Sequence, residues 1–190
     1  MGAIQIESFH SNTNREPSAF TLGHAHLIKT AAAQVEMLYV FVVEEDKSEF
    51  PFADRLELVR RGVENIPNVK VLPSGKFIIS QLTFAGYFNK AELQDSVVDP
   101  SLDVEVFAEE IAPVLGINIR FAGEEPLDTV TNGYNQTMRR ILPEHGIEFC
   151  EIPRLKIDDT IVSASEVRRL LKDKQFDAIE KLVPVTTLAY

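Results

Sequence analysis

Apolar segments of strand length alternate along this sequence with segments whose apolar residues recur at helical spacing. The segment LYVFVV, residues 38–43, is a continuous apolar run, which is typical of a strand buried on both faces of a sheet. The other expected strands are residues 3–9, 69–72, 118–122 and 147–152, and helices are expected over residues 23–37, 53–65, 103–115, 133–142, 165–171 and 176–182. Pro113 should end or bend the third helix. The alternation predicts an α/β fold, a doubly wound parallel sheet with helices on both faces.

The composition limits the classes of function. The length of 190 residues suits one domain over residues 1–190, and 45% hydrophobic with 25% charged residues is typical of a soluble globular protein. The net charge of −10 disfavours nucleic acid and anionic membranes as partners but allows a local basic pocket for a small anion. The single cysteine, Cys150, excludes an internal disulfide. With no signal peptide and no apolar run of the roughly 20 residues that a membrane helix needs, cytoplasm is the expected location.

Ligands of such a sheet bind beyond the carboxyl ends of the strands, so the loops at that edge carry the candidate site. The first of these loops leads into FTLGH at the expected start of the first helix. The N–H groups of a helix start can bind a phosphate, Gly23 allows the backbone to approach it, and Thr21 offers a hydroxyl. His24 can donate a hydrogen bond to a phosphoryl oxygen. On these residues alone, Thr21 also suits a helix N-cap and His24 a surface position, while His26 is expected to be a bystander.

A second loop at this edge contains GEEP, which follows the strand expected over residues 118–122. The backbone at Gly123 and the carboxylate of Glu125 can bind a ribose hydroxyl or an adenine amino group. Glycine and proline equally suit an ordinary turn, so this loop alone leaves both interpretations open.

A third loop leads through SASEVRR into another expected helix. Ser165 is the candidate N-cap, and Ser163, Ser165 and the pair Arg168–Arg169 can also bind an anion. Two phosphate-suited helix starts at one edge of a sheet suggest a clamp around a nucleoside triphosphate.

These motifs together resemble those of the nucleotidylyltransferase superfamily. TLGH is similar to its [HT]-x-G-H signature, VSASEVRRLL to its I-S-S-T-x-x-R type signature, and GEEP to its nucleotide-binding corner. More narrowly, the stretches FPFADRLELVRRGV, NVKVLPSGKFIISQLTFAGYF, IAPVLGINIRFAGEEP, VTNGYNQTM and EIPR make most of residues 20–172 similar to the C-terminal ligase domain of citrate lyase ligase. The resemblance implies a Rossmann-like fold of the HIGH type.

The resemblance also implies an AMP-forming acid–thiol ligase. Such an enzyme adenylates acetate with ATP and Mg2+, releases pyrophosphate, and passes the acetyl group to the thiol prosthetic group of the acyl-carrier subunit of citrate lyase. Carried over to this sequence, the catalytic residues are Thr21, His24 and Lys90, and the nucleotide-binding residues are Asn14, Phe20, Gly23, Gly123, Glu125, Ser163, Ser165 and Arg168. No residue is assigned to a metal, and Lys90 is equally explained as a solvated lysine.

Two departures from the family pattern leave other functions open. Residues 15–19 replace the single proline expected before FTLGH, which lengthens that loop, and 190 residues leave no room for the acetyltransferase-like domain that precedes the ligase domain in the family. One alternative is a nucleotidylyltransferase whose acceptor is a phosphomonoester, such as phosphopantetheine or a mononucleotide. The other is a nucleotide-binding module without turnover.

Overall fold

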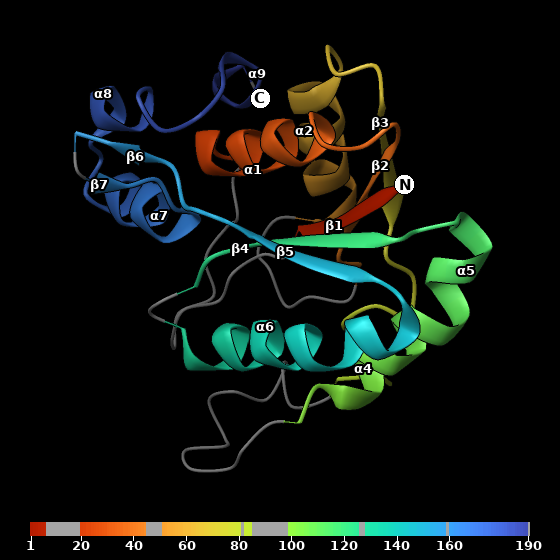
Figure 1. Cartoon of the computed structure of the whole chain (residues 1–190). Coiled ribbons are helices and arrows are strands. Elements are labelled where there is room, and N and C mark those ends of the chain that lie inside the picture. The colour runs from red at the N-terminus through yellow and green to blue at the C-terminus, as the bar shows by residue number, and fades with distance from the viewer. Residues whose placement is uncertain are drawn as a thin grey trace.

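The computed structural model describes residues 1–6, 20–44, 51–80, 82–84, 99–125, 128–158 and 160–189. Its centre is a five-stranded sheet in the order β3-β2-β1-β4-β5, in which all neighbouring strands are parallel (Figure 1). The strands are β1 (Gly2–Ile6), β2 (Leu38–Val42), β3 (Val69–Pro73), β4 (Ile119–Gly123) and β5 (Glu148–Ile152). The predicted α/β fold with a parallel sheet is confirmed.

Helices cover both faces of this sheet. On one face lie α1 (Leu22–Ala32) and α2 (Phe52–Val63), and on the other lie α4 (Ser101–Val106) and α6 (Thr129–Ile141) (Figure 1). The connections change face between β3 and β4, so the switch point of the sheet lies between the carboxyl ends of β1 and β4. The start of α1 and residues 124–125 after β4 therefore lie at the sheet edge where ligands of such folds bind.

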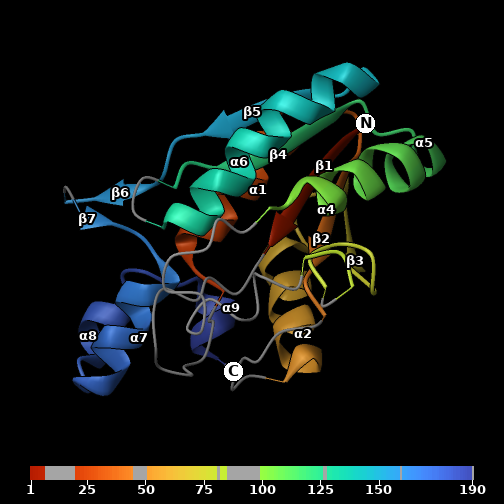
Figure 2. The same cartoon turned by 90° about the horizontal axis from the view of Figure 1, so that it is seen from below.

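The last part of the chain packs beyond the carboxyl edge of the sheet (Figure 1). It consists of the antiparallel pair β6 (Lys156–Ile157) and β7 (Thr160–Ile161), followed by α7 (Ala164–Lys172), α8 (Phe176–Ile179) and α9 (Val185–Leu188). An apolar cluster that includes Val162, Val167 and Leu182 holds these elements together. In Figure 2, α9 lies beside α2, so the end of the chain returns to the first face of the sheet.

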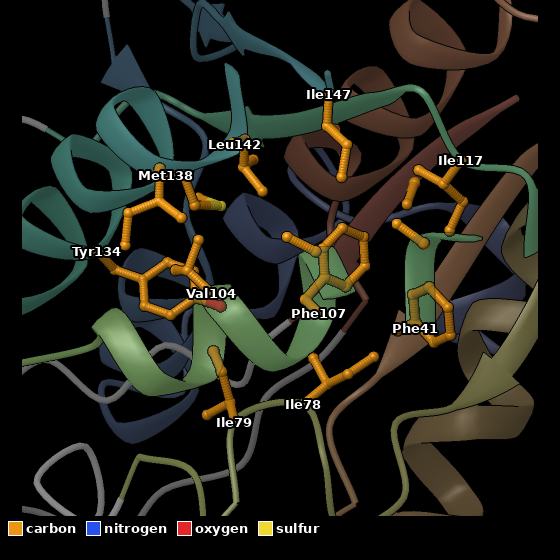
Figure 3. Close-up of a cluster of buried hydrophobic side chains, with 14 of the residues drawn as sticks. Phe41, Ile78, Ile79, Val104, Phe107, Ile117, Tyr134, Met138, Leu142 and Ile147 are labelled. Atoms are coloured by element: carbon orange, nitrogen blue, oxygen red, sulfur yellow. The ribbon is translucent and has the colours of Figure 1, made fainter. Parts of the chain in front are cut away.

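Each face of the sheet carries its own apolar core. The core beneath α1 and α2 contains Ile4, Ile28 and Val40, which are fully buried. The core on the α4 and α6 face contains Phe107 and Tyr134, which lie among the buried apolar side chains shown in Figure 3. Burial of one such large apolar side chain contributes about 1.5–3 kcal/mol, so the two cores fix the sheet edge that carries the candidate site.

The second core also contains a network of buried charges. The hydroxyl of Tyr134 donates to Oδ2 of Asp103 over 2.6 Å and accepts from Nη2 of Arg120 over 3.2 Å. Oδ1 of Asp103 accepts from the backbone N–H of Ile79 over 2.6 Å and from the hydroxyl of Thr83 over 2.5 Å. Buried charges need such partners, and this network ties β4, α4 and α6 to the segment that follows β3.

Several of the expected helices have different bounds. The helix expected over residues 176–182 is the short α8, which ends at Ile179. The first helix ends at Ala32 rather than near residue 37, because a turn separates it from β2. The helix expected to begin at residue 133 begins at Thr129, because Asp128 caps it: the carboxylate accepts from the N–H groups of Val130 and Thr131. A 3-10 turn, η2 (Leu142–His145), follows α6.

The helix expected over residues 103–115 is divided into three parts. Between α4 and α5 (Ala112–Leu115) lies a π-helical turn, η1 (Phe107–Ile111), in which the N–H of Ala112 donates to the carbonyl of Phe107 five residues earlier. The wider turn places Pro113 at the beginning of α5, where its missing N–H is tolerated. Pro113 does not end the helix, because α5 continues to Leu115, and the irregular turn lies before the proline. In the described part of the chain, no helix combines the length and the apolar character that a membrane crossing requires.

Candidate functional site

A reciprocal capping box builds the turn at the start of α1. Oγ1 of Thr21 accepts from the N–H of His24 over 3.4 Å, and Nδ1 of His24 accepts from the N–H of Thr21 over 3.1 Å. Because Nδ1 is an acceptor, the neutral imidazole carries its proton on Nε2. The expected N-cap role of Thr21 is confirmed. The alternative that His24 is a surface residue is wrong, since it is only 8% exposed.

The pKa of His24 is lowered from 6.5 to about 4, first by burial of the imidazole and then by the positive charges of Arg154 and Arg168. At neutral pH the ring is therefore uncharged, and its chemistry is that of a fixed hydrogen-bond donor at Nε2. A donor held in place before the reaction is what stabilisation of a phosphoryl group in the transition state requires.

Phe20 fixes the imidazole through packing. Its ring stacks on that of His24, with centroids 5.7 Å apart and 19° between the planes. The Phe20 side chain is buried and fills the space beside Gly62 of α2, where an added Cβ would lie 2.1 Å from the ring. Phe20 thus belongs to the core that supports His24, and a direct contact with a nucleotide stays a prediction.

Gly23 joins the two predicted helix starts. A Cβ on Gly23 would lie 2.7 Å from the carbonyl oxygen of Val162, which is closer than real Cβ contacts allow. Val162 directly precedes Ser163, and the Ser163 side chain caps α7 by accepting from the N–H of Glu166 over 3.1 Å. The glycine therefore lets the beginning of α1 touch the beginning of α7, a packing reason in addition to the predicted approach of a phosphate.

The N-cap of α7 differs from the prediction. Ser163 holds that position because its backbone is extended and its hydroxyl reaches the first turn, whereas Ser165, the expected N-cap, lies inside the turn. The Ser165 hydroxyl instead accepts from Nη2 of Arg168 over 2.8 Å. Arg168 is 8% exposed and its charge acts on His24, so the structure brings these predicted residues together.

Other parts of the chain already use some of the backbone groups at the start of α1. The N–H of Leu22 donates to the carbonyl of Leu182 over 2.8 Å, and the hydroxyl of Thr187 donates to the carbonyl of Phe20 over 2.9 Å. The N–H of His24 is used by the capping box. An anion at this turn therefore meets fewer backbone N–H groups than an uncapped helix start offers, and side chains must contribute more.

The residues predicted after β4 lie beside an arginine that the sequence interpretation did not include. Nη2 of Arg154 forms an ion pair with Oε2 of Glu125, and its Nε donates to the carbonyl of Glu124 over 2.6 Å. Glu125 is buried, and the carbonyl of Gly123 accepts from Nδ2 of Asn135 over 3.0 Å. Arg154 ends the motif EIPR just past β5. A basic residue at the carboxyl edge of the sheet was the signal that could have identified it.

Some predicted residues cannot be placed. Asn14, Lys90 and the lengthened loop at residues 15–19 lie outside the described residues. Within the described ranges, no three His, Cys, Asp or Glu side chains gather so that they could hold a metal ion. The structure brings together, at the carboxyl edge, the predicted residues Thr21, Gly23, His24, Ser163, Ser165 and Arg168, and Glu125 pairs with Arg154, whose charge acts on His24.

Comparison with known proteins identifies the family of this site. Residues 11–190 match the family model described as citrate lyase ligase C-terminal domain. The chain belongs to this family. It is 43% identical over 176 residues to the [citrate [pro-3S]-lyase] ligase of Escherichia coli (strain K12), covering 90% of this chain and 50% of that protein. It is 40% identical over 178 residues to the enzyme of the same name from Klebsiella pneumoniae, covering 90% of this chain and 51% of that one.

This chain spans about half the length of these curated relatives. Among solved structures, it is similar to Thermotoga maritima TmcAL bound with alpha-thio ATP, with a TM-score of 0.50 and 13% identity over 98% of this chain and 54% of that one. At this identity the similarity shows the shared fold.

Proposed function

We propose that this chain carries out the adenylation step of an AMP-forming acetate ligase that serves citrate lyase. The observation that carries the proposal is the contact between Gly23 and Val162, which places the Thr21–His24 turn beside the cap of α7. Membership of the citrate lyase ligase family and the names of the E. coli and K. pneumoniae relatives support citrate lyase as the protein served. Acetate as the acid is what the sequence resemblance to citrate lyase ligase implies. We further propose that residues 1–190 form one ligase domain.

In the proposed reaction, a carboxylate oxygen of acetate attacks the α-phosphorus of ATP. A bond from that oxygen to phosphorus forms, the bond between the α-phosphorus and the bridging oxygen breaks, and acetyl adenylate and pyrophosphate result. The protein supplies position and charge stabilisation, and no covalent nucleophile is needed. The later transfer of the acetyl group to a carrier thiol belongs to the same proposal for the whole enzyme.

Each site residue has a distinct role in this step. The neutral imidazole of His24 donates from Nε2 to a non-bridging oxygen of the α-phosphate, and Thr21 holds the imidazole through the capping box. Arg168 with Ser163 and Ser165 binds the leaving pyrophosphate at the start of α7. Gly123 and Glu125 line the nucleoside end. The nucleotide enters as its Mg2+ complex, and no residue of the chain is assigned to that ion.

Exchange of labelled pyrophosphate into ATP tests this function directly. We expect exchange that depends on acetate. His24→Gln should lower its rate by about 10^2- to 10^3-fold, the usual cost of losing one transition-state donor. Glutamine at this third helix position can still accept from the N–H of Thr21, so the capping box should survive. The control is His26→Gln, two residues further along α1, which should exchange at the wild-type rate.

The alternatives give different results in the same assay. Exchange that appears only with a phosphomonoester, such as phosphopantetheine, would replace the acetate ligase with a nucleotidylyltransferase. Binding of ATP in calorimetry without exchange for any acid or phosphomonoester would indicate a nucleotide-binding module without turnover.

A further inference from the structure

We propose that Arg154 is an additional nucleotide-binding residue that contacts the α-phosphate, and that Glu125 is its positioning partner. This inference rests on the proposed binding of a nucleotide at the same site. In this arrangement two arginines bind the triphosphate: Arg154 contacts the α-phosphate, and Arg168 contacts the phosphates that leave.

The register of the sheet places Arg154 at the site. Gly123 at the end of β4 pairs with Ile152 at the end of β5, so Glu125 and Arg154 each lie two residues beyond a matched pair of strand ends. These ends are next to the switch point between β1 and β4, where ligands of such sheets bind. Arg154 therefore lies at the same edge of the sheet as the start of α1.

The Arg154 guanidinium is held along one edge. Its Nε donates to the Glu124 carbonyl over 2.6 Å, and one Nη2 hydrogen is directed to Glu125. These contacts use two of the five N–H donors of the group. The Arg154 side chain keeps 20% of its surface exposed while that of Glu125 keeps 6%, so the arginine is the more accessible member of the pair.

Charge also favours this arrangement. A buried carboxylate near a triphosphate would repel it, and pairing with Arg154 neutralises Glu125. The charge of Arg154 affects the imidazole of His24 more strongly than that of Arg168 does. We assign Arg154 to the α-phosphate because it is paired with Glu125, which we place at the nucleoside end, and Arg168 to the phosphates that leave because it lies in α7.

Calorimetric binding of ATP and of AMP separates these two positions, because AMP has only the α-phosphate. We expect Arg154→Gln to weaken the binding of ATP and of AMP by the same factor, about 10- to 100-fold, as loss of a charge-assisted contact predicts. Arg168→Gln should weaken ATP binding by a similar factor and change the affinity for AMP by less than about threefold. The control is Arg139→Gln, because Arg139 is 58% exposed and its ion pair is with Glu151 rather than with Glu125.

Loss of Arg154 also removes the ion pair of the buried Glu125, so two further variants are needed. Glu125→Gln removes the buried negative charge alone, and Glu125→Gln/Arg154→Gln removes both charges. AMP binding that is weaker in the double variant than in Glu125→Gln supports a direct contact of Arg154 with phosphate, whereas equal affinity of these two variants would overturn the inference. A second readout is the NMR titration of His24, whose pKa should rise in Arg154→Gln and stay unchanged in Arg139→Gln.

The outcomes distinguish this inference from the proposed reaction. An unchanged affinity of Arg154→Gln for AMP, or a loss confined to ATP, would overturn the role of Arg154 even if acetate-dependent exchange is observed. Absence of exchange in the wild-type protein, together with an equal loss of ATP and AMP binding in Arg154→Gln, would refute the reaction and leave the binding role in place.

Discussion

Replacing Gly23 with alanine tests whether contact between the two helix starts controls the site. The added methyl would lie 2.7 Å from the carbonyl oxygen of Val162, whereas ordinary contacts begin near 3.4 Å. The backbone at one of the two positions must therefore move by about 0.7 Å, because neither atom belongs to a flexible side chain. This movement separates the Thr21–His24 turn from the cap at Ser163.

The expected magnitude combines two opposing effects. Overpacking costs about 1–3 kcal/mol, and alanine in place of glycine in a helix returns about 0.5–1 kcal/mol, so we expect a net loss of about 0.5–2 kcal/mol in the free energy of unfolding. Misplacement of reacting groups by about 1 Å can cost about 100-fold in rate, so the exchange rate should fall at least about tenfold. Gly133→Ala is the matched control, because Gly133 lies within α6 and an added Cβ there meets nothing within 4 Å.

Urea unfolding and acetate-dependent pyrophosphate exchange measure the two effects. We expect Gly133→Ala to stabilise the protein by about 0.5–1 kcal/mol with wild-type exchange, and Gly23→Ala to do the opposite on both counts. A Gly23→Ala protein that gains stability like the control and keeps its exchange rate would refute the role of this contact. A loss of exchange without a loss of stability would still support it, since the turn would have moved without unfolding.

Two further predictions concern buried polar groups. Because the pKa of His24 is lowered to about 4, the unfolded chain binds a proton that the native state resists, so stability should decrease as the pH falls from 6.5 towards 4. His24 should contribute about 2 kcal/mol to the difference in the free energy of unfolding between pH 7 and pH 5. Urea unfolding at these two pH values should show that His24→Gln lacks this contribution. The same loss of stability between pH 7 and pH 5 in both proteins would contradict the assignment. Tyr134→Phe removes the hydroxyl between Asp103 and Arg120 and should cost about 2–4 kcal/mol in urea unfolding, against less than about 0.5 kcal/mol for the half-buried Tyr39→Phe, and equal effects would argue against the network.

The sequence predicts the sheet better than the ends of the helices. Strands such as β2 are continuous apolar runs, and their burial on both faces leaves little choice of structure. Helix ends depend on single side chains and on tertiary contacts: Asp128 starts α6 one turn early, and the π-helical turn before Pro113 is invisible to hydropathy. The short pair β6–β7 has too few residues to show a period of two.

The sequence predicted most residues of the candidate site, but it predicted few of the contacts that hold these residues together. Thr21, Gly23 and His24 are brought to the start of α7, as expected for a clamp, but motif spacing could not reveal that Gly23 touches the backbone of Val162. The link between Glu125 and Arg154 depends on the register of β4 and β5, which a single sequence does not provide. The family resemblance suggested the residues of the candidate site, and the fold was needed to show which residues contact them.

A chain with a net charge of −10 can bind an anionic nucleotide only if its cations are placed selectively. Arg168 and Arg169 illustrate this, because the sequence suggested that both could meet a polyphosphate. Successive residues of a helix point about 100° apart, so Arg168 is buried at the site, whereas Arg169 is 56% exposed and pairs with Glu166 and Asp173. These exposed ion pairs of Arg169 add little to the stability of the protein. The attraction for a nucleotide therefore depends on the few cations held near His24, where low exposure reduces screening and each guanidinium contributes more than it would on the surface.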